Sequence, residues 1–129
     1  MNGIQFSSSD QIPLPPEEVQ IIDFTAQVYP DGKRVKVMVT FTPFQENPSA
    51  EIEIRSPAGQ ILSSVDIIET MDTQTEITLH LPGTPDAGSY SAHLKAFYLQ
   101  ERSSPDHPDL VAGLKQEKIG ESSTEFIIQ

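Results

Sequence analysis

Hydrophobic and polar residues alternate along most of this chain. Between positions 51 and 55, for example, Ile52 and Ile54 alternate with three charged residues. A period of two is typical of a β-strand, because successive side chains point to opposite faces. The alternation predicts seven strands, at residues 19–29, 33–44, 50–56, 61–68, 74–81, 88–100 and 123–128.

Turn-forming residues separate most of these segments. The sequence Pro-Asp-Gly-Lys at 30–33 lies between the first two, and its glycine can adopt the positive φ that tight turns need. Two alternating segments around such a turn form an antiparallel hairpin. Further turns with proline and glycine follow at 56–60 and 82–86, so we expect antiparallel neighbours along the chain.

The alternation also indicates how the strands are layered. A strand with one apolar and one polar face is typical of an antiparallel sheet, and two such sheets bury their apolar faces against each other. Residues 109–118 are the one candidate for a helical turn, which Gly113 weakens. We therefore predict an all-β fold, a seven-stranded antiparallel β-sandwich. Its predicted core consists of Ile22, Phe24, Val28, Val35, Val37, Val39, Phe41, Ile52, Ile54, Ile77, Leu79, Tyr90, Leu94 and Phe126.

One short motif points to a family of folds. Residues 86–90 read Asp-Ala-Gly-Ser-Tyr, which resembles the motif that leads into the sixth strand of immunoglobulin-like domains. The resemblance implies a tyrosine corner, in which the Tyr90 ring packs inward and its hydroxyl bonds to the backbone a few residues upstream. Gly88 would relieve the tight turn, and Asp86 would bond to nearby N–H groups. The alternative is an ordinary inward tyrosine beside a glycine turn.

The chain departs from antibody-type domains at two family positions. Disulfide-bonded members have cysteine two residues after the tyrosine, where this chain has Ala92, and the chain has no Trp for the third strand. It therefore resembles the broader immunoglobulin-like and fibronectin type III-like sandwiches. The resemblance implies that strands one, two and five share one sheet and that strands three, six and seven share the other, and it leaves the sheet of residues 61–68 open.

The length of 129 residues is that of a single domain. We assign residues 19–129 to the predicted immunoglobulin-like sandwich and residues 1–18 to a flexible or extended N-terminal leader. The Pro-Leu-Pro-Pro sequence at 13–16 favours polyproline II. It is either a stiff leader into the first strand or a ligand for an aromatic groove.

Composition and charge narrow the set of partners. The chain carries 8 Lys and Arg against 19 Asp and Glu, a net charge of −11 with an isoelectric point near 4.4. This charge argues against binding to nucleic acid or to an anionic membrane surface. No apolar run approaches the roughly 18 residues of a membrane span, and the first ten residues do not resemble a signal peptide. We expect a soluble protein, either cytoplasmic or a bacterial surface module.

Candidate catalytic or metal chemistry is sparse. The chain has no Cys, which excludes a disulfide, a thiol nucleophile and a thiolate metal site. Ser104, His107 and Asp109 could be assembled into a triad, but no nucleophile-elbow motif accompanies them. Asp106, His107 and Asp109 lack the spacing of a calcium loop. We expect a solvated loop there.

Glu51 and Glu53 offer two carboxylates on one strand face, about 7 Å apart, a spacing that glycosidase carboxylates sometimes have. A wet outer face that discourages edge pairing explains them more simply. We therefore expect no enzyme, no metal and no cofactor.

The sixth strand suggests a surface that needs a cover. If Tyr90 and Tyr98 point inward, Phe97 and Leu99 point outward on the other face. Two neighbouring exposed apolar side chains call for a cover. The candidates are residues 101–121, the N-terminal tail, or a second subunit or other partner.

The connection after this strand is long, with roughly 20 residues before the last predicted strand. It is either an irregular loop, or the two flanking strands extend as a long hairpin with its tip near 105–109. In either case we expect it to be the recognition loop. We expect a non-catalytic protein-interaction or structural module whose partner is an unknown protein or a second copy in a homodimer. The alternative is a carbohydrate-binding module, for which Tyr29 is the outward aromatic candidate. The expected partner-binding residues are Phe97, Leu99, Leu110, Val111 and Leu114.

Overall fold

The described part of the chain folds into seven β-strands and one short 3-10 turn. The computed structural model describes residues 12–101 and 114–129. All pairings between these strands are antiparallel. The elements are η1 (Pro16–Glu18), β1 (Ile21–Val28), β2 (Arg34–Phe41), β3 (Ser49–Arg55), β4 (Ile61–Ile67), β5 (Gln74–His80), β6 (Gly88–Glu101) and β7 (Leu114–Ile128).

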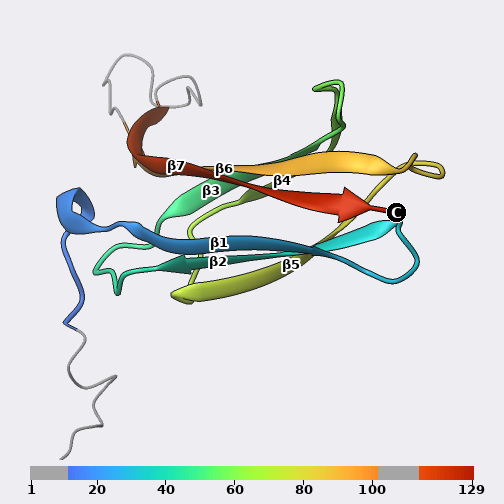
Figure 1. Ribbon diagram of the computed structural model, residues 1–129. Helices are drawn as coiled ribbons and strands as arrows, with labels where there is room; N and C mark the ends of the chain where they lie inside the picture. Colours follow the sequence, from blue (N-terminus) through green and yellow to red (C-terminus); the bar gives the residue numbers. More distant parts are fainter. Residues whose placement is uncertain (1–11, 102–113) are drawn as a thin grey trace, which may run out of the picture.

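The strands form two sheets that pack face to face (Figure 1). One sheet has the order β1-β2-β5 and the other the order β4-β3-β6-β7, so the predicted all-β, seven-stranded sandwich is confirmed. The strand whose sheet was open, β4, pairs with β3. The turn between them explains this, because Ser56 N–H donates to Gln60 O at 2.8 Å and Gly59 takes a φ of 88°. So short a turn keeps the two strands adjacent.

The core fills the space between the two sheets. On the central strand β2 of one sheet, Val35, Val37 and Val39 are at most 1% exposed. On β3 and β6 of the other sheet, every second residue is buried against them. Burial of each aliphatic side chain contributes about 1.5–3 kcal/mol. Of the predicted core residues, Val28 and Ile77 are partly buried, Ile22 is exposed, and the others are buried.

The prediction that Ile22 lies in the core is wrong. The pairing of β1 with β2 shifts by one residue between Ile21 and Asp23, so Ile22 bulges and is 60% exposed. A β-bulge reverses the direction of the side chains on one side of it. Ile21 therefore packs against the core in place of Ile22.

The tyrosine corner implied by the motif has the expected geometry. Tyr90 is 3% exposed, and its hydroxyl donates to Asp86 O at 2.7 Å. Its ring stacks on Phe126 with 5.8 Å between the centroids. Gly88 has a φ of 156°, and a Cβ there would lie 3.0 Å from Pro57 Cγ. Asp86 contributes through its main-chain carbonyl, and the expected bonds from its carboxylate are not among those of the described residues.

The last strand is much longer than predicted. β7 begins at Leu114 rather than at residue 123, and it pairs with β6 from Glu101 to Gly88. The long-hairpin alternative is therefore confirmed for the two strands, while its expected tip at 105–109 lies outside the described residues. The candidate helical turn at 109–118 is instead a strand over residues 114–118. Those residues lack alternation, and the β6–β7 register shifts between Ala96 and Phe97. The sequence of residues 114–118 does not indicate a strand, because this segment has no apolar face. It is a strand because it pairs with β6.

Candidate functional site

Several connecting segments meet at one end of the sandwich, on the left in Figure 1. They are the described N-terminal segment 12–20, the β2–β3 loop 42–48 and the β4–β5 loop 68–73, and we call this set the loop end. The strand directions require β6 to end there and β7 to begin there. The opposite end holds the β1–β2 turn and the C-terminus (Figure 1).

Part of the expected leader is docked on the sandwich. Leu14 N–H donates to Pro43 O at 3.0 Å, and Gln45 N–H donates to Leu14 O at 2.9 Å. Leu14 and Phe44 form a parallel bridge, and both pack against the core. Residues 12–18 are thus part of the folded unit, with Pro15 extended at φ −68° and ψ 160°. Residues 1–11 lie outside the described part of the chain.

The β4–β5 loop is also fixed to its surroundings. Thr70 N–H donates to Pro48 O at 2.8 Å, and Glu69 N–H donates to Ser49 Oγ at 2.9 Å. The hydroxyls of Thr70 and Thr75 lie 2.9 Å apart. Glu69 has a φ of 51°, a conformation that L-residues other than glycine adopt only when their surroundings hold it. The loop therefore presents its side chains on a defined backbone.

This loop displays apolar side chains to solvent. Met71 is 84% exposed and Ile68 is 60% exposed, and Ile12 of the N-terminal segment is 75% exposed. Scattered exposed apolar residues are ordinary, but these three lie on segments that belong to the same end of the sandwich (Figure 1). Sequence reasoning missed them, because the strand pattern ended at Ile68 and Met71 stood beside a polar turn. The signal was the pair Ile67-Ile68, where the alternation of β4 breaks at the start of the loop.

Tyr98 supports the loop end from inside. It is 6% exposed, and its hydroxyl donates to Glu46 O at 2.8 Å. Burial raises the pKa of Tyr98 above its usual value, and the Glu46 carboxylate adds to the effect. The β2–β3 loop is thereby tied to β6 across 52 residues of chain.

Phe97 is covered within this chain, which is one of the alternatives that the sequence left open. It lies on the outer face of the sheet as predicted, opposite Ser49, yet it is 2% exposed. Lys95 Nζ lies 5.9 Å from its ring centroid. The expected cover comes from this chain itself, and Phe97 has almost no surface left for a partner. Leu99 is partly buried.

The remaining predicted contact residues are placed only in part. Leu110 and Val111 lie outside the described residues, as do Ser104, Asp106, His107 and Asp109. Leu114 is the first residue of β7, at the loop end.

The outer face of the four-stranded sheet carries a polar groove of about 440 Å³. Across the strands the pairing sets Lys95 between Glu51 and Glu121. Arg55 Nη2 lies 2.9 Å from Glu53 Oε1. Glu51 and Glu53 therefore lie on the same polar face, as predicted, and the Glu53 carboxylate is paired with Arg55. The groove is lined by Glu51, Glu53, Arg55, His93, Leu94, Lys95, Glu121, Ser122 and Ser123.

One pair beside this groove has the elements of a nucleophile and a base. Ser91 Oγ lies 2.9 Å from His93 Nε2. A catalytic pair also needs a group that orients the imidazole and donors for an oxyanion. Glu53, opposite His93, bonds to Arg55 instead. The neighbouring main-chain N–H groups belong to paired strands, which leaves the pair as a polar contact on an open sheet face.

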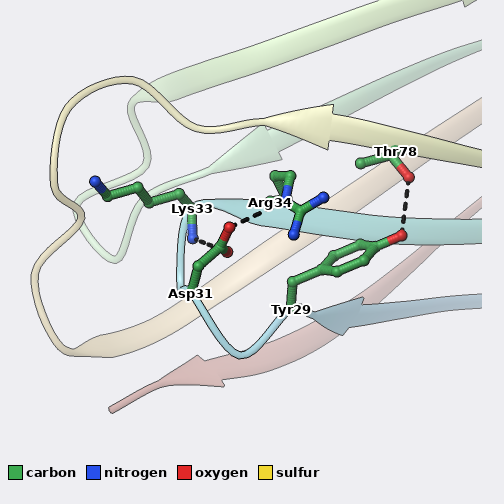
Figure 2. A network of polar contacts seen from close by, with 5 residues as sticks. All are labelled: Tyr29, Asp31, Lys33, Arg34 and Thr78. Carbon is green, nitrogen blue, oxygen red and sulfur yellow. Dashed lines mark hydrogen bonds and ion pairs between the residues drawn. The ribbon is translucent and has the colours of Figure 1, made fainter.

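The second polar network lies at the β1–β2 turn (Figure 2). Asp31 accepts hydrogen bonds from Lys33 N–H at 2.9 Å and Arg34 Nε at 3.0 Å, and these bonds lower the pKa of Asp31. The Arg34 guanidinium lies 4.3 Å from the Tyr29 ring centroid. The Tyr29 hydroxyl shares a 3.1 Å hydrogen bond with Thr78 on β5. The ring therefore lies across β2, with one face covered by Arg34.

The described residues contain no group of His, Asp and Glu that could hold a metal ion. Among them there is also no helix long and apolar enough to cross a membrane. Searches against protein-family models and against curated proteins returned no match for this chain.

Proposed function

We propose that this chain is a non-catalytic protein-interaction module that contacts a protein partner with its loop end. The observation that carries the proposal is the exposure of Met71 and Ile68 on a loop whose backbone is fixed by hydrogen bonds. A fixed loop with exposed apolar side chains loses little conformational entropy on binding. Exposed apolar groups that gather in one place are typical of interaction sites.

The proposal includes an immunoglobulin-like, fibronectin type III-like sandwich as the scaffold. Two features support this class. The sheets have the orders β1-β2-β5 and β4-β3-β6-β7, which is the partition that the resemblance implied, with β4 beside β3. The bond from Tyr90 to the Asp86 carbonyl lies at the corner before the sixth strand, where the family has it.

The first experiment compares equally polar substitutions at the two ends of the molecule. Met71→Asp and Ile12→Asp place a carboxylate at the loop end, whereas Ile127→Asp does so at a position that is 57% exposed near the other end. Each variant is used as bait in extracts of the source cells. A partner that is retained by the wild type and Ile127→Asp and lost with Met71→Asp supports the proposal. A partner that is lost with Ile127→Asp alone contradicts it.

A second experiment addresses the connection between β6 and β7. Because β7 begins at Leu114, residues 103–112 are replaced by a short Gly-Ser linker, which leaves both strands intact. Loss of the partner with this variant assigns recognition to the connection. Retention of the partner, together with its loss in Met71→Asp, assigns recognition to the β4–β5 loop.

The carbohydrate-binding alternative is less favoured. A sugar platform needs an aromatic ring with a free face, and Arg34 covers one face of Tyr29 while Thr78 engages its hydroxyl. A glycan array tests this directly. Binding that is lost in Tyr29→Ala and kept in Met71→Asp would restore the carbohydrate function.

A further inference from the structure

The four edge strands of the sandwich differ in how they are protected against pairing with another strand. Natural sheets protect their edges with charges, bulges or covering segments. β1 has the bulge at Ile22 and lies against β7 (Figure 1). β7 is rich in charged residues, and its ladder with β6 is interrupted by a register shift. β5 carries Glu76, paired with Lys36, and His80.

Strand β4 has fewer of these protections. Its sequence, Ile-Leu-Ser-Ser-Val-Asp-Ile, has one charged residue, Asp66, and no proline or glycine. It pairs with β3 on one side only, and its register shift lies at the Ile61 end. Ile61, the first residue of the strand, and Ile68, directly after its end, are 54% and 60% exposed. β4 therefore offers an open ladder edge flanked by apolar side chains.

The pairing with β3 shows which face each β4 residue occupies. Val65 and Ile67 oppose Ile52 and Ala50, which are buried, so they face the core. Ser64 and Asp66 oppose Glu53 and Glu51 on the outer face. Ile61 opposes Arg55 and so also lies on the outer face.

These faces make β4 complementary to an antiparallel copy of itself. With Val65 opposite Val65 on a two-fold axis, core-facing residues meet core-facing residues. Ser64 of each copy then lies opposite Asp66 of the other, which gives the carboxylate a hydroxyl donor and keeps the two Asp66 carboxylates apart. The bulge beside Ile61 brings this residue opposite Ile68 of the other copy, so the exposed isoleucines cover one another. An isologous two-fold contact needs this self-complementarity.

We propose that the β4 edge is a self-association site, at which two copies join their four-stranded sheets by antiparallel β4–β4 pairing. Main-chain hydrogen bonds supply the attraction, and the Ser64–Asp66 and isoleucine contacts fix the register. This surface does not include Met71 or Ile12, but it shares Ile68 with the loop end.

The charge and size of the contact determine how the dimer behaves. One strand per copy buries less than the roughly 800 Å² per partner of a standard interface, so the dimer is weak and depends on concentration. Each copy carries a net charge of −11, and added salt screens the repulsion between copies. Association therefore strengthens as the ionic strength rises.

The test is sedimentation equilibrium of the full chain over a wide concentration range, at low and high salt. The mass is expected to rise from 14.2 kDa towards twice that value, and at lower concentrations in high salt. A mass of 14.2 kDa at every concentration overturns the proposal.

Charge substitutions at Ser64 test the register. Ser64→Lys faces Asp66 of the other copy and tightens the dimer, whereas Ser64→Glu weakens it, each by roughly two- to tenfold in Kd. Ser64→Glu combined with Asp66→Lys places opposite charges across the contact again and restores association to at least the wild-type level. Ser123→Lys and Ser123→Glu are matched controls, because Ser123 is exposed on the same sheet at its β7 edge. Equal shifts for the Ser64 and Ser123 variants would show that net charge alone acts and would overturn the β4 register.

Discussion

The two ends of strand β6 are secured by the same chemical group over very different chain distances. Near its start, the Tyr90 hydroxyl donates to Asp86 O, four residues away, at 2.7 Å. Near its end, the Tyr98 hydroxyl donates to Glu46 O, 52 residues away, at 2.8 Å. Both rings face the core and both are nearly buried. The Tyr90 bond shapes a local corner. The Tyr98 bond joins two distant segments and fixes the β2–β3 loop, to which the N-terminal segment and the β4–β5 loop are bonded.

This difference assigns separate roles to the two ends. At the Tyr90 end, the Tyr90 ring stacks on Phe126, and the backbone at Gly88 lies close to Pro57. At the Tyr98 end, the β2–β3 loop holds the N-terminal segment and the β4–β5 loop through main-chain bonds. Loss of Tyr90 is expected to weaken the sandwich as a whole. Loss of Tyr98 is expected to weaken the sandwich and also to release the segments of the loop end.

The largest effects are expected from removing either ring. Tyr90→Ala and Tyr98→Ala each leave a cavity in the core and cost about 3–5 kcal/mol in the free energy of unfolding, measured with denaturant. Hydrogen exchange distinguishes them. The Gln45 amide, which bonds to Leu14, exchanges faster in Tyr98→Ala than global destabilisation explains, and in Tyr90→Ala it does not. Equal exchange in both variants would remove the distinction between the ends.

An intermediate effect is expected at Gly88. An alanine Cβ there lies 3.0 Å from Pro57 Cγ at a φ of 156°, so Gly88→Ala is expected to cost about 1–3 kcal/mol. Gly59→Ala is the control, because its φ is 88° and nothing lies within 4 Å of its Cβ. It reports the backbone strain without the contact. If Pro57→Ala recovers none of the loss in Gly88→Ala, the contact is not the cause.

Smaller effects are expected from removing the hydroxyls alone. Tyr90→Phe and Tyr98→Phe each lose one hydrogen bond, worth about 1 kcal/mol. The midpoint of denaturant unfolding measures both. A midpoint for Tyr90→Phe equal to that of the wild type within error would show that its ring, and not its bond, holds the corner.

The smallest effect is a pH dependence specific to the Tyr98 end. Because burial raises the pKa of Tyr98, the unfolded chain loses this proton at a lower pH than the folded chain does. The contribution of Tyr98 is therefore fully present below about pH 10, the ordinary tyrosine value, and is lost as the pH rises through the folded pKa. Unfolding of the wild type between neutral and alkaline pH, compared with Tyr98→Phe, measures this loss. If the free energy of unfolding falls equally with rising pH in the wild type and in Tyr98→Phe, the loss of stability belongs to groups other than Tyr98.

The comparison also shows what the sequence could predict. Strand alternation placed Ile52, Ile54 and the β2 valines in the core, because the period of two needs only neighbouring residues. The Tyr90 corner was predictable for the same reason, since its partner is four residues away. Tyr98 was expected to point inward, but no local pattern could indicate that its partner is Glu46.

The errors have related causes. Ile22 was misplaced because a bulge depends on how β1 pairs with β2, and β7 was shortened because its first residues pair with β6 without an apolar face. Phe97 was placed on the correct face, but the sequence left open what covers it, since tertiary packing determines this. The exposed Met71 was missed because the bonds that hold its loop come from Ser49 and Pro48 on another segment.

The positions of the first and last strands determine how the molecule would respond to a mechanical load. β1 starts at the loop end, whereas β7 finishes at the opposite end, and the two strands lie against each other (Figure 1). A pulling force applied between Ile12 and Gln129 would therefore run along these strands and load their contacts in shear. Contacts in shear must break together, while contacts peeled from one end break one after another. The sandwich is thus arranged to resist extension along its length, and single-molecule pulling would report its unfolding rate under force.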